Sequence, residues 1–139
     1  MPISFFLNNE LRGIKKKREL LDRIRILAYI EQRVIGNLAV VLMSDKELIQ
    51  YNKKHLKHNY YTDIITFDYS NNEVISGDLL ISVDRVSDNA KIFKVPFHNE
   101  LHRVIIHGIL HLCGYKDKSK NDIKQMRQKE NFYLNIELN

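Results

Sequence analysis

Two histidines and one aspartate stand at spacings that suit a metal ion. His107 and His111 are four residues apart, and Asp117 follows them. On an α-helix, residues four apart lie on one face about 6 Å apart along the axis, so both imidazoles can reach one cation. Gly114 can end that helix with a left-handed backbone, and the turn brings Asp117 back as a third ligand. Three protein ligands leave one position open, which is typical of catalytic zinc.

Zinc proteases with the motif H-E-x-x-H-x-x-G-x-x-H place their ligands at the same offsets. Their general base is the glutamate after the first histidine, but here that residue is Gly108, which cannot accept a proton. A simpler interpretation is a core helix with two partly buried histidines and a solvated Asp117. That interpretation leaves the coincidence of all three offsets unexplained. The spacing therefore predicts a metal site and leaves both protease and nuclease open.

The cysteine and two further histidines fit this site less well. Cys113 follows His111 by two residues and points away from the ligand face, so we expect a small buried residue. His98 and His102 are also four residues apart, but they lie away from the face of His107. We expect both of them at the surface.

Length and composition are those of one ordinary globular domain. The chain has 139 residues, of which 44% are hydrophobic and 28% charged, and we expect a single domain over residues 1–139. No apolar run reaches the roughly 18 residues that cross a bilayer, and no secretory signal is evident, so we expect a cytoplasmic protein without membrane contact. The single cysteine excludes an internal disulfide and fits a reducing compartment.

Basic residues outnumber acidic ones. The net charge is +5 and the isoelectric point is near 9.3. The basic residues gather at positions 15–18 and around Lys53, Lys54 and Lys57. Such a surface suits a phosphate backbone, although lysine runs on helices are often only solvated faces. Charge alone therefore permits nucleic-acid binding without establishing it.

Hydrophobic patterns place the strands in the first part of the chain. Apolar or alternating runs predict strands at Ile3–Leu7, Leu38–Met43, Ile64–Tyr69 and Leu79–Val83, with a turn at residues 70–73. A first helix is expected at Glu19–Val34, with its core face formed by Leu20, Ile24, Leu27 and Ile30 or Glu31. A second helix should follow the capping box at residues 44–47.

Helices fill the remainder. They are expected at Asp84–Phe93, Asn99–Cys113 and Asn121–Tyr133, with Pro96 interrupting the first two. The middle helix has an apolar face of Leu101, Val104, Ile105, Gly108 and Leu112. The last one should face inward with Ile123, Met126 and Tyr133. This order predicts an α+β domain in which helices, including a zincin-like metal helix, pack on a small mixed sheet.

Three segments carry a family resemblance. Residues 107–117 match the signature H-G-x-L-H-L-x-G-Y-D-H at His107, Gly108, Leu110, His111, Leu112, Gly114 and Tyr115. Upstream, TDIITF at residues 62–67 is similar to T-D-V-L-S-F, and GDLLIS at residues 77–82 is similar to G-D-I-x-I-S. Together and in this order, the segments resemble the YbeY family of bacterial metal-dependent endoribonucleases.

Two positions depart from that family pattern. The family's third ligand is a histidine, and the corresponding residue here is Asp117. A carboxylate oxygen can bind zinc at a similar distance, although an anionic ligand makes bound water less acidic and favours harder ions. The family also has an arginine placed for phosphate contact where this chain has Leu56. Lys53, Lys54 or Lys57 would then have to supply the positive charge.

The resemblance implies a single-strand-specific, zinc-dependent endoribonuclease acting in 16S rRNA 3′-end maturation, ribosome biogenesis and RNA quality control. Its partners would be RNA, in particular rRNA and ribosomal particles. His107, His111 and Asp117 would hold one zinc ion, or another divalent ion, that activates the attacking water. Asp63 and Asp78 are candidates for a separate general base. Two alternatives stay open, a metalloprotease-like hydrolase and a non-catalytic ribosome-assembly factor whose metal only stabilises the fold.

Overall fold

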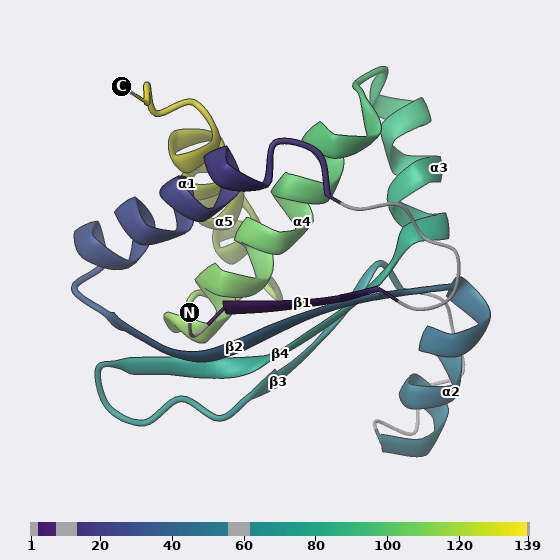
Figure 1. Ribbon diagram of the computed structural model, residues 1–139, viewed down its shortest axis with the longest axis horizontal. Helices are drawn as coiled ribbons and strands as arrows, with labels where there is room; N and C mark the ends of the chain where they lie inside the picture. The colour runs from purple at the N-terminus through teal and green to yellow at the C-terminus, as the bar shows by residue number, and fades with distance from the viewer. Residues whose placement is uncertain (1–2, 8–13, 56–61, 139) are drawn as a thin grey trace.

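The structure is a computed structural model that describes residues 3–7, 14–55 and 62–138 (Figure 1). In chain order its elements are β1 (Ile3–Leu7), α1 (Lys17–Ile30), β2 (Val34–Met43), α2 (Asp45–His55), β3 (Ile64–Asp68), β4 (Val74–Ser82), α3 (Val83–Phe93), α4 (Phe97–Leu112) and α5 (Lys120–Leu134).

The strands form one mixed sheet of four strands in the order β1-β2-β4-β3. β1 and β4 both run parallel to β2, and β3 pairs with β4 in the antiparallel direction. Helices α1, α4 and α5 lie over one face of this sheet, and α2 lies on the other side (Figure 1). The α+β class and the small mixed sheet predicted from the sequence are therefore confirmed.

Alternation along the strands divides the core into two parts. Leu38, Val40 and Leu42 of β2 belong to the larger cluster beneath the helices. Met43 packs with Leu48 of α2 in a smaller cluster on the opposite face. Successive strand residues point to opposite faces, so β2, β3 and β4 each contribute to both clusters. A side chain's position in a strand thus decides whether it can reach α4.

Helix α4 packs closely on the sheet because position 108 has no side chain. A Cβ atom on Gly108 would lie 2.9 Å from Ile64 Cδ1 and 2.9 Å from Leu79 Cδ2, closer than real Cβ contacts. The apolar face predicted for this helix is buried as expected. Position 108 therefore faces the sheet, and the protease glutamate would have no room there.

Several predicted boundaries need correction. α1 ends at Ile30, and β2 begins at Val34 instead of Leu38 because the strand continues through a register shift between Ile35 and Leu38. β4 likewise begins at Val74 instead of Leu79, so the hairpin with β3 is longer than the apolar run indicated. α4 begins at Phe97, directly after Pro96, instead of at Asn99.

Two predicted core residues are exposed. Ile30, predicted as the alternative to Glu31, is the last residue of α1 and is 44% exposed, whereas the Glu31 side chain is 12% exposed. Ile123 is 52% exposed and lines an open pocket beside Asp117. Met126 and Tyr133 of the same helix are buried as predicted. Among the described helices, none is both long and apolar enough to span a bilayer.

Candidate metal centre

The predicted ligands meet at the C-terminal end of α4. The Nε2 atoms of His107 and His111 are 3.0 Å apart. The Asp117 carboxylate approaches from the turn after the helix, with Oδ2 3.2 Å from His107 Nε2 and 3.3 Å from His111 Nε2. One potential ligand atom from each residue lies within 4.8 Å of the others. The structure thus brings together the three residues that the spacing singled out.

The outer ring nitrogens show which atoms face the centre. His111 Nδ1 is 2.9 Å from the backbone oxygen of Tyr115, and a carbonyl only accepts, so Nδ1 carries the proton. His107 Nδ1 is 2.7 Å from Glu130 Oε2 and donates to that carboxylate. Both Nε2 atoms therefore direct lone pairs toward the Asp117 oxygen. Three acceptors that face one another repel unless a cation lies among them.

The separations fit a small metal ion. Ligand atoms about 2.0–2.1 Å from a tetrahedral zinc stand about 3.3–3.4 Å from each other. The observed separations are 3.0, 3.2 and 3.3 Å. Two imidazole nitrogens and one carboxylate oxygen also form a known catalytic zinc donor set. The group can therefore hold a metal ion with one position left for water or substrate.

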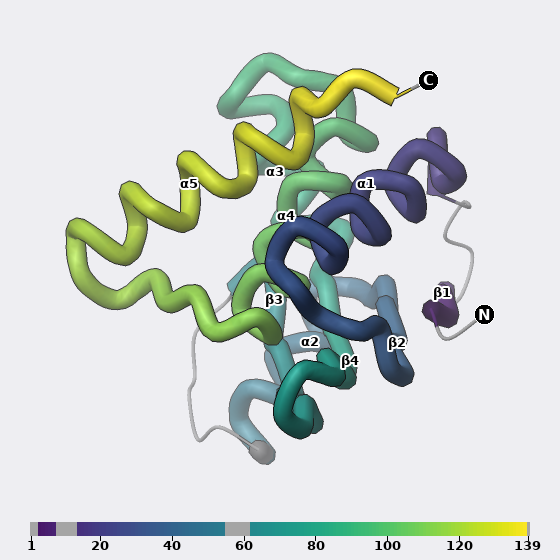
Figure 2. Tube along the Cα trace, turned by 90° about the vertical axis from the view of Figure 1, so that its left-hand side faces the viewer, coloured from purple at the N-terminus to yellow at the C-terminus, as the bar shows by residue number. Residues whose placement is uncertain are grey.

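Asp117 is placed by two well-defined helix ends. Gly114 has a φ of +103°, and its N–H donates to the His111 carbonyl at 2.9 Å, which ends α4 in the expected way. Ser119 starts α5 with a capping box shared with Asp122. Figure 2 shows the chain leaving α4 through this turn and returning as α5 alongside it. The carboxylate is held near the histidines by backbone geometry on both sides.

Glu130 on α5 anchors the first histidine from behind. Its side chain is buried, and Arg103 Nη1 lies 3.0 Å and Arg127 Nη1 3.4 Å from Oε1. Burial alone would raise the pKa of the Glu130 carboxyl, but the hydrogen bond and charge of His107 outweigh burial and lower it. Burial likewise opposes the charged form of His107, yet Glu130 raises the pKa of that imidazole. The carboxylate is thus ionised and orients the ring.

A second network orients His111 through Tyr115. The Tyr115 hydroxyl donates to Glu31 Oε1 at 2.8 Å, and Lys129 Nζ lies 3.2 Å from Oε2, which also accepts from the Tyr133 hydroxyl. Burial opposes ionisation of Glu31, but these three donors lower its pKa overall. Because the Tyr115 carbonyl accepts from His111, the carboxylate at the end of α1 positions that imidazole indirectly.

A pocket of about 310 Å³ opens beside His107. Asp63, at the start of β3, lines it together with Asp117 and Glu130, and burial raises the pKa of the Asp63 carboxyl against the opposing effect of His107. Asp78 is different. It alternates with Gly77, which faces α4, and therefore points to the opposite face of the sheet. Of the two predicted general bases, only Asp63 is beside the metal ligands.

Comparison with known proteins decides the family. The model of the family described as Endoribonuclease YbeY matches residues 8–136. The chain belongs to the YbeY family. The endoribonuclease YbeY of Bacteroides fragilis is 44% identical over 126 residues, which cover 88% of this chain and 91% of that protein. The one from Parabacteroides distasonis is 42% identical over 137 residues, covering 98% and 96%.

A solved structure agrees with this assignment. TM1509 from Thermotoga maritima, determined in solution, has a TM-score of 0.68 and 29% sequence identity, covering 95% of this chain and 86% of that one. The resemblance found in the sequence is therefore confirmed. In this YbeY family member, His107 and His111 of the candidate ligand group lie on α4, and Asp117 lies in the turn that follows it.

Two of the lysines predicted to bind RNA, Lys53 and Lys54, do not lie beside the ligands of this YbeY family site. Lys53 and Lys54 are exposed on α2, and Leu48 of that helix packs against the sheet face opposite α4. Lys57 and Leu56 lie outside the described residues. The arginines that line the pocket beside the ligands come instead from α4 and α5.

The prediction for His102 is wrong. Its side chain is 6% exposed, and Nε2 lies 2.9 Å from the Lys15 carbonyl. Most sides of α4 are covered by other elements near His102. A residue that points away from the ligand face is therefore not necessarily exposed to solvent. His98 is partly buried instead of exposed. Cys113 is buried in the core, as expected.

Sequence reasoning missed the residues that support the ligands. A signal for Glu130 was present, because it lies four residues after Met126 and three before Tyr133, on the apolar face of α5. Arg103 and Glu100 precede His107 by four and seven residues and share its face of α4. A charged residue on an apolar helix face indicates a buried partner. Glu31 was the alternative to Ile30 on the core face of the first helix, but no local pattern points to its partners.

Proposed function

We propose that this protein is a zinc-dependent endoribonuclease that hydrolyses phosphodiester bonds in single-stranded RNA. The observation that supports this proposal most directly is the convergence of His107 Nε2, His111 Nε2 and Asp117 Oδ2. Both imidazoles donate hydrogen bonds from Nδ1–H on the outer side. Relatives covering most of the chain are named endoribonuclease YbeY, which supports RNA as the substrate. The nitrogen and oxygen donor set favours zinc, and another divalent ion could occupy it.

The roles of the surrounding residues follow from their positions. A bound zinc would supply a Lewis acid and an activated water. Glu130 and the Tyr115 carbonyl hold the two imidazoles in the ligating tautomer. Asp63 lies in the pocket where it can accept a proton from the attacking water, and its raised pKa suits that exchange. Arg127 can hold a phosphate at the rim of the pocket.

We extend the proposal to the biological substrate. Membership of the YbeY family supports rRNA in ribosomal particles, with cleavage at the 3′ end of 16S rRNA during maturation in the cytoplasm. Lys53, Lys54 and Lys57 stay candidate RNA contacts. Their place on and after α2 would let them bind a part of the substrate distant from the scissile bond.

The test uses a labelled single-stranded RNA and nuclease-free protein. We expect cleavage with zinc-loaded protein and none after chelation or in His111→Ala, whose folding is checked by circular dichroism. An Asp88→Asn variant is the matched control, because it removes an exposed charge on α3 that does not line the pocket beside His107. Cleavage that survives both chelation and His111→Ala would exclude the proposal.

The same protein preparations test the alternatives. Position 108 faces the sheet and has no room for a glutamate base, which argues against a protease. Casein cleavage lost in His107→Ala would reverse that conclusion. RNA binding without cleavage, together with a lower melting temperature after metal removal, would favour a non-catalytic assembly factor.

A further inference from the structure

A second pocket adjoins the metal pocket, and the proposed reaction assigns it no role. It has a volume of about 450 Å³, within the range of about 300–1,000 Å³ typical of small-ligand sites. It lies among α1, α4, α5 and the connection from α3 to α4. Glu100, Arg103 and Arg127 line both pockets, so the two pockets share one wall.

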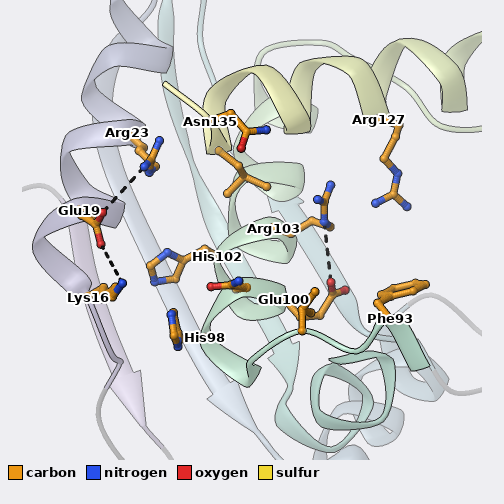
Figure 3. Close-up of a pocket in the computed structure, with 13 residues that line it drawn as sticks. Lys16, Glu19, Arg23, Phe93, His98, Glu100, His102, Arg103, Arg127 and Asn135 are labelled. Carbon is orange, nitrogen blue, oxygen red and sulfur yellow. Dashed lines mark ion pairs between the residues drawn. The ribbon is translucent and has the colours of Figure 1, made fainter. Parts of the chain in front are cut away.

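The walls combine positive charge with one exposed aromatic ring. Phe93, the last residue of α3, is 53% exposed and lines the pocket. Figure 3 shows Phe93 and Arg127 on the same side as Arg103, with Lys16 and Arg23 on the opposite wall. An exposed aromatic ring in a basic groove is the arrangement with which proteins bind single-stranded nucleic acid.

The groups differ in how free they are to bind a ligand. Arg103 is held by Glu130 and Glu100, and Arg23 Nη1 donates to two backbone carbonyls, so both are fixed parts of the wall. The Arg127 side chain is 53% exposed, and its ion pair with Glu130 is longer, with 3.4 Å between Nη1 and Oε1. Phe93 and Arg127 are therefore the groups that can adapt to a base and to its phosphate.

We infer that this pocket binds the unpaired nucleobase next to the scissile phosphate, with Phe93 as the stacking partner and Arg127 as the phosphate contact. A nucleobase has a flat apolar face for the ring and polar edges for neighbours such as His98 and Asn99, which also line the pocket. Base-paired RNA cannot present a base in this way. The pocket would thus explain a preference for single strands. This inference rests on the proposed endoribonuclease function.

The absence of tryptophan from the chain allows a direct test. Phe93→Trp keeps an aromatic ring and adds a single tryptophan, which can be excited separately from the tyrosines, and a base stacked on it quenches its emission. Ile92→Trp is the matched control, because Ile92 is adjacent and 71% exposed but does not line this pocket. Both changes are added to His111→Ala, so that the RNA is bound and not cleaved.

We expect saturable quenching of Phe93→Trp by a short single-stranded RNA, and little quenching of Ile92→Trp. An oligomer with abasic sites, which keeps its phosphates, should quench neither, and a duplex should quench neither. In the same His111→Ala background, Phe93→Ala should weaken binding of labelled single-stranded RNA about tenfold, equal to ~1.4 kcal/mol and within the range for one stacked base.

The outcomes separate this inference from the proposed function. Anisotropy of the RNA label shows whether RNA is bound. Binding without quenching of Phe93→Trp would contradict the proposed base pocket but would not affect the proposed nuclease function. Equal quenching of both tryptophan variants would also overturn it, because contact would then not be specific to the pocket. Quenching specific to Phe93→Trp, together with no RNA cleavage by the wild type, would support the base pocket and contradict the proposed nuclease function.

Discussion

At the residue scale, the site depends on where two protons lie. Each imidazole donates a hydrogen bond from its Nδ1–H to an acceptor on the outer side. The acceptor is Glu130 for His107 and the Tyr115 carbonyl for His111. The Nε2 lone pairs are then fixed toward Asp117 without competition from the other tautomer. Partners of this kind commonly change metal affinity by about 10–100-fold.

Glu130→Gln tests the outer partner of His107. The amide keeps the size of the side chain but loses the charge that pairs with Arg103, so zinc affinity should fall about 10–100-fold. Competition with a chelating dye measures it. Glu73→Gln, an exposed position in the turn before β4, should leave affinity unchanged. An unaltered affinity in Glu130→Gln would show that the carboxylate does not support the metal.

Asp117→Ala tests the third ligand. We expect a larger loss of zinc affinity than for Glu130→Gln, because a direct bond is removed. Asp117→His introduces the residue of the family signature and should retain one zinc per chain. Elemental analysis of protein purified without a metal-binding tag gives the stoichiometry. Full occupancy and unchanged affinity in Asp117→Ala would contradict the three-ligand site.

Asp63→Asn tests the proton acceptor. The substitution keeps the shape of the side chain beside the ligands but removes its basicity, so kcat for RNA cleavage should fall about 100-fold, as for loss of a general base. Metal content should not change. Asp78→Asn, on the other face of the sheet, is the control and should cleave normally. Equal activity in both variants would show that Asp63 does not act as the proton acceptor.

At the scale of elements, the position of α4 on the sheet sets the depth of the metal centre. The helix comes close because Gly108 meets Ile64 and Leu79 without a side chain of its own. The same helix carries both histidines on the face adjoining Gly108, so its distance from the sheet also fixes their distance from Asp63, directly before β3.

Gly108→Ala tests this contact. Alanine favours a helix by ~1 kcal/mol over glycine, but overpacking costs about 1–3 kcal/mol, and the added methyl would lie 2.9 Å from the partly buried Ile64 and the buried Leu79. We expect a net loss of up to about 2 kcal/mol in the free energy of unfolding, measured with urea after chelation. Gln128→Ala, at an exposed position of α5, should change the free energy of unfolding little. A gain of stability in Gly108→Ala would mean that the sheet has room.

At the scale of the whole molecule, one carboxylate joins distant parts of the chain. Glu31 at the end of α1 accepts hydrogen bonds from Tyr115 in the turn after α4 and from Tyr133 and Lys129 on α5. These partners are 84 to 102 positions away along the chain. The contact closes the helical layer over the larger core and supports His111 at the same time.

Glu31→Gln should reveal this link through pH. The donors lower the folded-state pKa of Glu31 below its ordinary value of 4.5. A lowered pKa stabilises the fold above the unfolded-state value, and the contribution is lost as pH falls through the folded-state pKa. The variant should therefore be less stable than the wild type at pH 7, with a gap that narrows below about pH 4.5. Urea unfolding at several pH values measures it, and a constant gap would contradict the assignment.

The sequence by itself determined what depends on local geometry. Helical periodicity places His107 and His111 on one face, Gly114 ends the helix, and the apolar face of α4 is read directly from its spacing. The gathering of strands in the first part of the chain and of helices in the second was enough for the α+β class. The exact start of β2 and β4 was not, because pairing between strands extends them beyond their apolar runs.

Only the tertiary structure decided which distant residues complete the site. Glu130 is 23 positions from His107, and Glu31 is 84 from Tyr115, so no local pattern relates them. Asp63 and Asp78 looked equivalent until the sheet placed them on different sides. His102 seemed exposed until other elements covered it. Spacing encodes neighbours along one helix or strand, whereas burial and pairing depend on how separate elements pack, which is a property of the whole fold.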